Sequence, residues 1–497
     1  MHFDMSQFDS YREDNRREVK KAKGGLPLSL WETYSAFANC YGGVIILGVK
    51  ENHDGSWNMT GLENASKLKK DFWNAINDKK KVSINLLMDK DVKVYEENGK
   101  VILVIRVPRA KREQKPVYIN GNIFDGTFRR NWEGDYHCDR SEVLAMLRDQ
   151  PEETADMKIL EDMSLDVLHE ETIHAYRNRH IAFRREHVWE RLEDNEYLER
   201  IGAAKISAKD GKLHPTAAGL LMFGEEYKIL YEFPEYFLDY REVLDPTIRW
   251  TDRLQSSSGD WTGNLFDFFF RVYGKLVKDL KIPFKLEGIT RIDDTPVHKA
   301  LREALANCLV NTDFYFQRGI VIRKDVNSIT MENPGNIRTG KEQMLKGGIS
   351  DPRNKALMKM FNLIGIGERA GSGVPDIYSV WKQQGWEPPE VIEEYGPDRT
   401  ILKLSFVKSA DKKVLIKSAD KKVLIKSADK KTVTKKTEQQ LEDILGKMDF
   451  NKEYKTSEIA KFIDVKETRA RTLLKELVKQ GKIKAIGKNK GRRYIRK

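Results

Sequence analysis

One spacing near residue 300 restricts how the surrounding chain can fold. Glu303 and Asn307 stand four residues apart, and two glycine turns follow at Asn333-Pro-Gly335 and Gly371-Ser-Gly373. Residues i and i+4 share one face of a helix, so this carboxylate and this amide would face the same cavity. The carboxylate could orient a water and the amide oxygen could bind Mg²⁺. The glycines would let backbone approach a base and phosphates, so the sequence predicts an ATP site.

The order of these motifs resembles the GHKL ATPase fold of gyrase B, histidine kinases and MutL. More closely, residues 296–406 resemble the GHKL-type region at the C-terminal end of proteins labelled RecG-related helicases. The residues that carry this resemblance are Arg302-Glu-Ala-Leu305, Asn333-Pro-Gly335, Ser350-Asp-Pro-Arg-Asn354, Ile366-Gly-Glu-Arg369 and Gly371-Ser-Gly373. It implies that Glu303 orients the attacking water, that Asn307 holds Mg²⁺, and that Asn333, Gly335, Gly371 and Gly373 contact the nucleotide.

The chain departs from the GHKL pattern at Asn333. Active members read the adenine amino group with an aspartate there, whereas an asparagine offers only a carbonyl oxygen. We therefore expect ATP binding with weak hydrolysis at most, and a GHKL-like fold without nucleotide is the alternative. A helicase motor also needs a Gly-x-x-x-x-Gly-Lys-Ser/Thr loop, which the sequence lacks, so strand unwinding is not expected.

The chain as a whole has the composition of an intracellular protein. Its 497 residues suffice for several cores. Cys40, Cys138 and Cys308 are far apart, which favours neither disulfides nor a zinc site. The N-terminal segment lacks a basic stretch followed by an apolar core, and no run approaches the about 20 apolar residues that span a bilayer. We expect a cytoplasmic protein, a homo-oligomer, with no membrane contact.

The N-terminal module shows a second set of motifs. An apolar helix ends in Ser35-Ala-Phe-Ala-Asn39, and a continuous apolar run bounded by glycines, Gly42-Gly-Val-Ile-Ile-Leu-Gly-Val49, follows it. Such a run predicts a buried strand after a turn made by Gly42 and Gly43. The pattern resembles the Schlafen-type, AlbA-like DNA-binding domain over the whole module. Arg129 and Arg130 flank its later strands and are candidates for phosphate contacts.

The same resemblance raises the possibility of a nuclease. In Schlafen relatives that cut RNA, two glutamates five residues apart and a later acid hold a divalent metal. Glu13 and Glu18 have that separation, and Glu51 follows the Gly-Val strand. Three carboxylates around Mg²⁺ or Mn²⁺ could activate a water against a phosphodiester. Contact with nucleic acid without cutting is the alternative.

Positive charge is concentrated at the end of the chain. Residues 408–436 carry 11 Lys and 3 Asp, and residues 437–497 carry 17 Lys or Arg and 9 Asp or Glu, so residues before 408 sum to about −4 of the total of +12. The first segment repeats Lys-Ser-Ala-Asp-Lys-Lys-Val-Leu-Ile. A nine-residue period places successive apolar clusters on opposite helix faces, which predicts a linker. A basic tail indicates contact with nucleic acid.

The last segment has the pattern of a winged helix. Helices are predicted at 439–445, 456–462 and 467–480, and a basic hairpin at 482–496. The N-terminal end of the third helix would enter the major groove. The candidate DNA-contacting residues are Lys466, Arg469, Arg471, Lys488, Lys490, Arg492 and Arg493.

Together these signals predict a multidomain α/β (α+β) protein. Its expected parts are a Schlafen/AlbA-like domain (1–151), a connecting, largely helical α/β domain (152–292), a GHKL-like α/β sandwich (293–406), a Lys-rich linker (407–437) and a winged helix (438–497). Within the connector, His214-Pro-Thr-Ala-Ala-Gly-Leu-Leu-Met-Phe-Gly224 predicts a helix that begins at the proline and ends at the glycine.

Three functions fit this organisation. The leading hypothesis is a nucleotide-responsive DNA-binding protein, a transcriptional regulator or a component of bacterial defence, with ATP in the GHKL-like domain. The alternative is a Schlafen-like metal-dependent nuclease acting on RNA, tRNA or DNA under the control of ATP. A third is an assembly scaffold without nucleotide binding.

Overall fold

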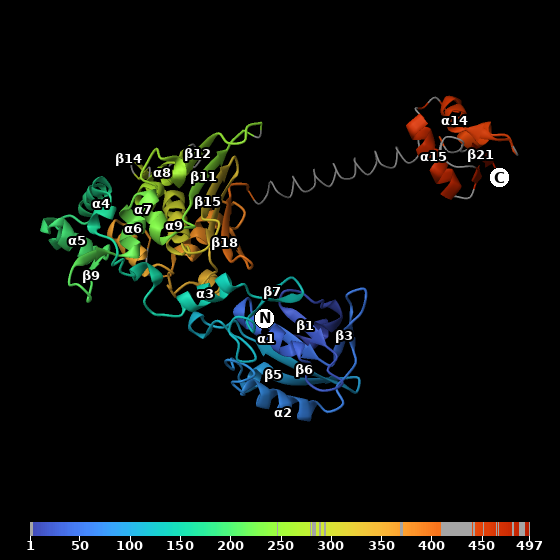
Figure 1. Cartoon of the computed structure of the whole chain (residues 1–497), viewed down its shortest axis with the longest axis horizontal. Helices are drawn as coiled ribbons and strands as arrows, with labels where there is room; N and C mark the ends of the chain where they lie inside the picture. Colours follow the sequence, from blue (N-terminus) through green and yellow to red (C-terminus); the bar gives the residue numbers. More distant parts are fainter. Residues whose placement is uncertain are drawn as a thin grey trace. The chain divides into compact units, whose positions relative to one another are not determined.

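The structure is a computed structural model of the chain. It describes residues 3–245, 247–278, 280, 285–287, 290–292, 295–367, 371–408, 440, 443–450, 452–463, 465, 467–479, 482–486 and 493–496. The chain forms two compact units, Met1–Val407 and Lys408–Lys497 (Figure 1).

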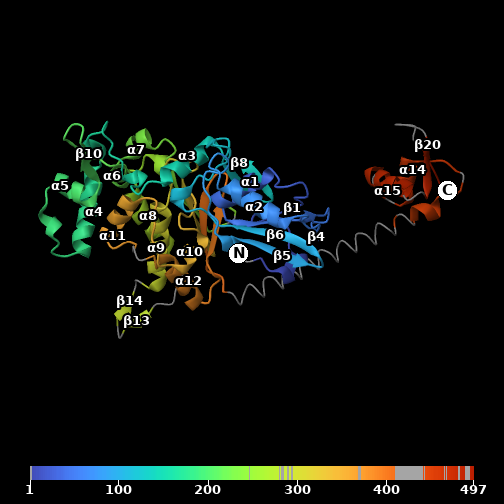
Figure 2. The same ribbon diagram turned by 90° about the horizontal axis from the view of Figure 1, so that it is seen from below.

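The first unit begins with a four-stranded sheet in the order β1-β2-β6-β5. Strand β1 (Arg17–Lys20) runs parallel to β2 (Gly43–Leu47), and β6 (Lys100–Val107) pairs antiparallel with β2 and with β5 (Val92–Glu97). Figure 2 shows β5 and β6 side by side near helices α1 (Ser29–Asn39) and α2 (Ala65–Ile76). The predicted apolar helix and the following strand are both present.

Both faces of this sheet are buried, which explains the uninterrupted apolar run. Ile45 and Leu47 pack with α1 and α2, whereas Val44 and Ile46 pack on the other face with Phe8 and Trp57. Successive side chains of a strand point to opposite faces, so a strand covered on both sides needs an apolar residue at every position. Gly42 makes the preceding turn at a φ of +70°, a conformation that suits glycine.

Shorter elements complete this module. They are η1 (Met5–Ser10), β3 (Val49–Glu51), β4 (Trp57–Met59), η2 (Asp89–Asp91), η3 (Arg112–Gln114), the hairpin β7 (Phe128–Asn131) and β8 (Gly134–His137), and α3 (Arg140–Asp149). The hairpin packs on α1. Ser35 and Asn39 of the predicted motif are fully buried, and the Asn39 amide bonds to Val117 and Phe128 backbone. The motif is therefore structural.

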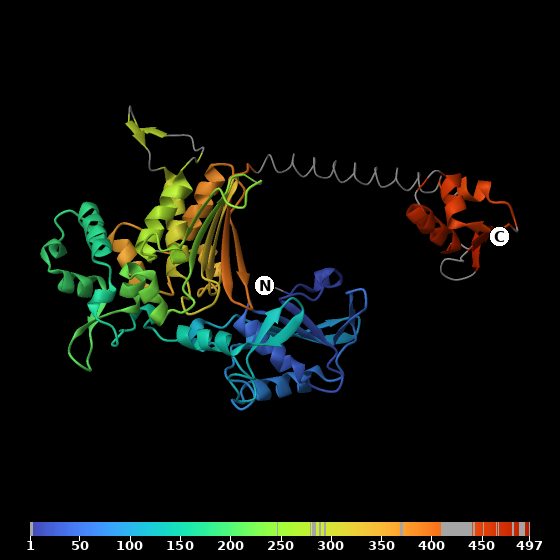
Figure 3. The same ribbon diagram turned by 45° about the horizontal axis from the view of Figure 1, so that its top comes forward.

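A second, six-stranded sheet has the order β12-β11-β15-β16-β18-β17. Strands β11 and β15 are parallel and the other neighbours are antiparallel. The strands are β11 (Leu238–Val243), β12 (Asp252–Gln255), β15 (Ile320–Asp325), β16 (Ser328–Pro334), β17 (Glu390–Glu394) and β18 (Arg399–Ser405). Figure 3 shows helices layered against this sheet, as an α/β sandwich requires.

The helical layer spans the expected connector and the expected sandwich. It includes α4 (Glu170–Phe183), α5 (Asp194–Ile201), α6 (Ala217–Phe223), α7 (Glu226–Glu232), α8 (Leu265–Val277), α9 (Pro296–Val310), α10 (Lys341–Lys346), α11 (Lys355–Leu363) and α12 (Gly373–Gln383). Short elements among them are η4 (Ala155–Met157), η5 (Leu165–Val167), η6 (Val188–Arg191), β9 (Ala204–Ile206), β10 (Leu213–Pro215), η7 (Ser256–Ser258), β13 (Lys285–Glu287) and β14 (Thr290–Ile292). Helix α6 ends at Gly224 as expected, but Thr216 caps its start, and Pro215 lies in β10.

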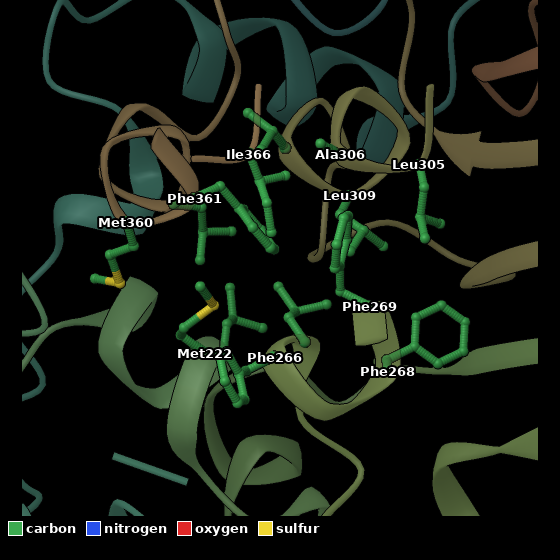
Figure 4. Close-up of a cluster of buried hydrophobic side chains, with 14 of the residues drawn as sticks. Met222, Phe266, Phe268, Phe269, Leu305, Ala306, Leu309, Met360, Phe361 and Ile366 are labelled. Atoms are coloured by element: carbon green, nitrogen blue, oxygen red, sulfur yellow. The ribbon is translucent and has the colours of Figure 1, made fainter. Parts of the chain in front are cut away.

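One hydrophobic core joins these helices to the six-stranded sheet. It extends from Leu160 to Leu404, and Figure 4 shows part of it, where Phe266 and Phe269 of α8 meet Leu309 of α9 and Phe361 of α11. Strands β11 and β12, which precede residue 292, belong to the same sheet as β15–β18. The expected connector and sandwich therefore share one core.

The second unit contains the elements expected at the end of the chain. Residues 443–447 are helical, and α14 (Thr456–Phe462) and α15 (Glu467–Lys479) follow. Strands β19 (Tyr454–Lys455), β20 (Ile483–Ile486) and β21 (Arg493–Arg496) form a sheet in the order β19-β21-β20. Leu473, Leu474 and Leu477 of α15 are buried in its core. Most of the Lys-rich repeat lies outside the described residues.

Among the described residues, no helix is both long enough and apolar enough to cross a membrane.

Candidate functional site

Helix α9 carries the predicted carboxylate–amide pair. Thr295 is its N-cap and Pro296 its first residue, a position that proline favours because the missing N–H would have no helical partner. Asn307 Nδ2 donates a hydrogen bond to Glu303 Oε1 over 3.0 Å, so the two side chains lie together on one face as the spacing predicted. This bond fixes the amide orientation, which leaves Asn307 Oδ1 as the oxygen available to a cation.

Five of the six predicted nucleotide residues line one cleft. These are Glu303, Asn307, Asn333, Gly371 and Gly373. The unoccupied space of the cleft, open solvent included, is about 1100 Å³. Apolar side chains, among them Met331, Ile377 and Leu402, form part of its wall. An apolar wall with a few converging amides is the usual composition of a small-molecule site. The residues present therefore fit a nucleotide whose base contacts these apolar side chains.

Asn333 lies at the end of β16, where the predicted base would be read. Its Nδ2 donates to the carbonyls of Asn311 at 3.4 Å and Pro334 at 3.1 Å, and the residue is buried. The amide nitrogen is therefore used within the protein. The Oδ1 atom is the group with which Asn333 can accept a bond from an adenine amino group, as the substitution of asparagine for aspartate requires.

The two glycines of the second turn have different steric roles. A Cβ on Gly373 would lie 2.1 Å from Glu303 Oε1. The glycine at the start of α12 therefore leaves just enough room for the Glu303 carboxylate. A Cβ on Gly371 would lie 2.7 Å from the backbone nitrogen of Ile349, and Gly371 also has a φ of +69°. Gly373 thus makes room for a functional group, whereas Gly371 permits contact between two backbone segments.

Gly335, the sixth predicted nucleotide residue, lies outside the lining of this cleft. A Cβ there would meet the guanidinium of Arg353 at 3.0 Å. Arg353 donates to the carbonyls of Asn311 at 3.2 Å and Asn336 at 3.0 Å and pairs with Asp149. Gly335 therefore gives Arg353 space to join α9 to the turn after β16. Glu368 and Arg369 of the quoted motifs lie outside the described residues.

The rim of the cleft is bonded to the N-terminal module. Arg112 Nε lies 3.0 Å from Asp351 Oδ2, and Asp351 lines the cleft. Arg109 pairs with the buried Glu393 at 3.0 Å and donates to the Ile337 carbonyl at 2.7 Å, while Glu393 accepts from Ile337 N at 2.9 Å. Ile337 also lines the cleft. Two arginines of one module thus hold two rim segments of the other.

The three predicted metal ligands influence one another electrostatically. Burial, and after it the carboxylates of Glu18 and Glu51, raise the pKa of Glu13 to about 7, against the Val19 N–H and Arg130, which lower it. Glu18 pairs with Arg130 at 2.8 Å and with Lys20 at 2.9 Å. Among the described residues, no group of three His, Cys, Asp or Glu side chains is placed to hold a metal ion. Glu18 already has two cations as partners, so metal binding by Glu13, Glu18 and Glu51 stays a prediction.

The two predicted arginines of β7 are largely enclosed. Arg130 has no exposed side-chain surface and pairs with Glu18 and with Asp135 at 2.9 Å, so it does not present its charge to a ligand. Arg129 lies 3.2 Å from the buried Glu142, with 18% of its side chain exposed. Burial against carboxylates makes both arginines part of the fold, a role that sequence position does not reveal.

Two of the predicted tail cations are described in full. Arg471 pairs with Glu467 at 3.4 Å and remains 63% exposed, and Arg493 pairs with Glu453 at 3.3 Å and remains 48% exposed. Their role in binding DNA stays a prediction. Lys466, Lys488, Lys490 and Arg492, and the side chain of Arg469, lie outside the described residues.

The sequence-based prediction missed one feature of the β7–β8 hairpin. Trp132 occupies the two-residue turn with 77% of its surface exposed and a φ of +55°. Such turn positions favour glycine or asparagine. The available signal was a tryptophan next to Asn131 and two residues before Gly134, where a small residue is expected.

Comparisons with known proteins agree with this arrangement. Residues 10–138 match the family model described as "Schlafen, AlbA_2", and residues 318–400 match "Putative ATP-dependent DNA helicase recG C-terminal". Residues 144–239 match a model described as "Domain of unknown function (DUF8451)". The expected composition is confirmed: the chain combines a Schlafen AlbA_2 domain with a RecG-related, ATPase-like domain.

Two solved structures are similar to the chain. The DIP2311 protein from Corynebacterium diphtheriae shares 16% identity over 97% of this chain and 95% of its own, with a TM-score of 0.40. The N-terminal domain of a "Putative ATP-dependent DNA Helicase RecG-related Protein" from Nitrosomonas europaea shares 28% identity over 27% of this chain and 89% of its own, with a TM-score of 0.22. No match was found among curated proteins.

Proposed function

We propose that the protein is a nucleotide-responsive DNA-binding protein, a transcriptional regulator or a component of a defence system, that binds ATP with Mg²⁺ in the cleft beside α9. One observation carries this proposal: five predicted nucleotide residues line one cleft, and arginines of the Schlafen-type module hold its rim. ATP would supply a triphosphate whose charge is neutralised by the cation. Asn307 Oδ1 would hold that cation, Glu303 would orient a water, and Asn333 Oδ1 would accept from the base.

The rim offers a physical route from nucleotide to DNA. Asp351 pairs with Arg112 at 3.0 Å and with Arg338 at 3.4 Å, and Asp351 and Arg338 both line the cleft. An anion that enters repels Asp351 and attracts Arg338, because Coulomb interactions are strong where side chains are shielded from water. Occupancy would therefore change the bond between Asp351 and Arg112, and with it the contact to the Schlafen-type module.

DNA affinity measured with and without ATP tests this route. ATP should change the affinity of the intact protein for DNA, and Arg112→Ala should abolish that change while ATP still binds. Arg140→Ala is the matched control, because Arg140 belongs to the same module and contacts the Phe124 ring away from the cleft. An equal response to ATP in Arg112→Ala and in the intact protein would refute the route.

The second unit is proposed as the main source of DNA affinity, in the form of a winged helix. Residues from 408 onward carry a net charge of +16, whereas the preceding residues are slightly acidic. A chain ending at Val407 keeps its own core, because in the described residues the core of the second unit involves only side chains from 444 onward. Each neutralised phosphate contributes a slope of about −0.9 to log affinity against log salt.

Removal of the tail should therefore weaken binding to duplex DNA and flatten its salt dependence. In the intact protein, Arg469→Ala and Arg471→Ala should reduce sequence preference more than total affinity. Fluorescence anisotropy between about 50 and about 200 mM salt measures both effects. A protein ending at Val407 that binds duplex DNA as tightly, with the same slope, would move the DNA site to the Schlafen-type module.

A nuclease activity is the second candidate, and the mutual effect of Glu13, Glu18 and Glu51 supports it. A cation would have to replace Arg130 and Lys20 as partners of Glu18. Purified protein with Mg²⁺ or Mn²⁺ should then cut single-stranded RNA, tRNA or DNA, and Glu51→Gln and Glu18→Ala should both abolish cutting. Cutting that persists in both variants would indicate a contaminant, and no cutting of any substrate would refute this candidate. The chain lacks a phosphate-binding loop of helicase motors, so unwinding is no part of the proposal.

A further inference from the structure

Two cavities follow the boundary between the Schlafen-type module and the ATPase-like domain. The first is lined by Arg16, Arg106 and Lys341, and the second by Glu13, Trp132 and Arg318. Both include Tyr41 and Glu393 in their lining, so they adjoin each other. Their unoccupied spaces, open solvent included, are about 930 and 1160 Å³. We call the two together the seam groove.

The first half of the seam groove is cationic. Arg16, Arg106, Arg109 and Lys341 line it, against Glu342 and Glu393. Arg109 is occupied by Glu393, and Lys341 donates to the Val391 carbonyl. Arg106 is exposed, and the pair between Arg16 and Glu342 is long, at 3.8 Å, with 84% of the Glu342 side chain exposed. Arg16 and Arg106 are therefore the cations best placed to meet an anion.

The second half offers an exposed aromatic face. Trp132 is 77% exposed in its tight turn, and Asn15, Asn131 and Arg318 line the same cavity. Asp14 and Glu393, which also line it, are paired with Arg17 at 2.6 Å and with Arg109. A large aromatic residue with positive φ carries a conformational cost, and such residues gather at functional positions. Four carboxylates, those of Glu13, Asp14, Glu393 and Glu394, line this half against Arg130 and Arg318, which disfavours a phosphate here but not a neutral base.

We propose that the seam groove binds a single-stranded oligonucleotide, with phosphates at Arg16 and Arg106 and an unpaired base stacked on Trp132. Stacking needs an exposed base face, which a duplex keeps covered. This proposal rests on the nucleic-acid binding of the proposed function and adds where on the protein a single strand binds. Thr339 lines both the seam groove and the nucleotide cleft, so one segment forms a wall of each.

Ultraviolet crosslinking of the intact protein to oligothymidylate and to oligouridylate tests the position. Crosslinks should map to the peptide that contains Trp132. The affinity of residues 1–407 for the same strands should fall about tenfold in Trp132→Asn and little in Trp132→Phe, because stacking contributes about 1–3 kcal/mol per base. Asparagine suits the positive φ, so Trp132→Asn should fold.

Tyr136→Ala is the matched control, because Tyr136 is 54% exposed in the same hairpin and does not line the groove. The affinity for duplex DNA should be the same in Trp132→Asn and in the unaltered protein. Comparison of the DNA strand with the RNA strand shows which sugar is preferred. Unchanged affinity in Trp132→Asn, or crosslinks only beyond residue 407, would overturn the inference and leave the proposed function intact. Failure of the intact protein to bind any nucleic acid would overturn both.

Discussion

The nucleotide cleft and the carboxylates of the Schlafen-type module were both predicted from short spacings, but their side chains have different partners in the structure. In the cleft, Glu303 and Asn307 bond to each other and face open space. In the module, Glu18 instead pairs with Arg130 and Lys20. A spacing within one helix fixes which side chains meet, whereas a spacing that includes a strand leaves their partners to distant segments. A metal ion at Glu18 would have to replace two cations, whereas the Glu303–Asn307 bond leaves Asn307 Oδ1 available to one.

The largest expected effect is a loss of stability when the buried Arg130 is replaced. Arg130→Met should destabilise the protein by about 3–5 kcal/mol, because it leaves Asp135 without its cation and Glu18 with Lys20 alone, in a shielded place. Denaturant unfolding measures the loss, and Arg140→Met, at an exposed position, should cost far less. Equal stability of the two variants would mean that Glu18 is not committed to Arg130, and the contrast between the two regions would disappear.

A smaller effect is expected at the cleft. Gly373→Ala should weaken binding of ATP with Mg²⁺ about tenfold, because the added Cβ, 2.1 Å from Glu303 Oε1, displaces the carboxylate and breaks a charge-assisted bond to Asn307 worth about 1.5–3 kcal/mol. The fold should survive, because the end of a flexible side chain can move. Ser372→Ala is the control, since Ser372 makes no side-chain capping bond. Unchanged affinity in Gly373→Ala would show that the Glu303–Asn307 bond does not position the amide.

The smallest expected effect is a pH dependence at Glu13. Its pKa is about 7 in the folded protein and near 4.5 when unfolded, so the folded state binds more protons between these values. Stability should therefore fall as pH rises from about 4.5 to about 7. For a fully buried carboxyl, the free energy of unfolding would fall by about 1.4 kcal/mol per pH unit in this range. Glu13 is partly exposed, so the expected fall is smaller. Glu13→Gln should flatten the slope in thermal unfolding, and an unchanged slope would place the titrating group elsewhere.

Local periodicity accounts for what the sequence could predict. The buried strand β2, helix α1 and the Glu303–Asn307 pair all follow from spacings of two to four residues. Glycine positions predicted turns correctly at Gly42 and Gly371, where φ is positive. In each case the physical constraint lies within one segment, so the neighbouring sequence contains the information.

Long-range partners account for what the sequence could not predict. Gly335 was expected to contact the nucleotide, but it faces Arg353, whose ion-pair partner is Asp149, 204 residues away. Arg109 and Arg112 meet rim residues 228 and 239 positions later. The parallel pairing of β11 with β15 likewise extends the sheet into the expected connector. Such contacts depend on how whole segments pack, and no local pattern encodes them.

The central claim is that the cleft beside α9 binds ATP through Asn307. Isothermal titration calorimetry of the intact protein with ATP and Mg²⁺ tests it most directly, with Asn77→Ala as a control for an exposed asparagine. We expect measurable binding that Asn307→Ala abolishes and Asn77→Ala leaves unchanged. Equal ATP affinity in Asn307→Ala and in the unaltered protein, or no ATP binding by the unaltered protein, would contradict it.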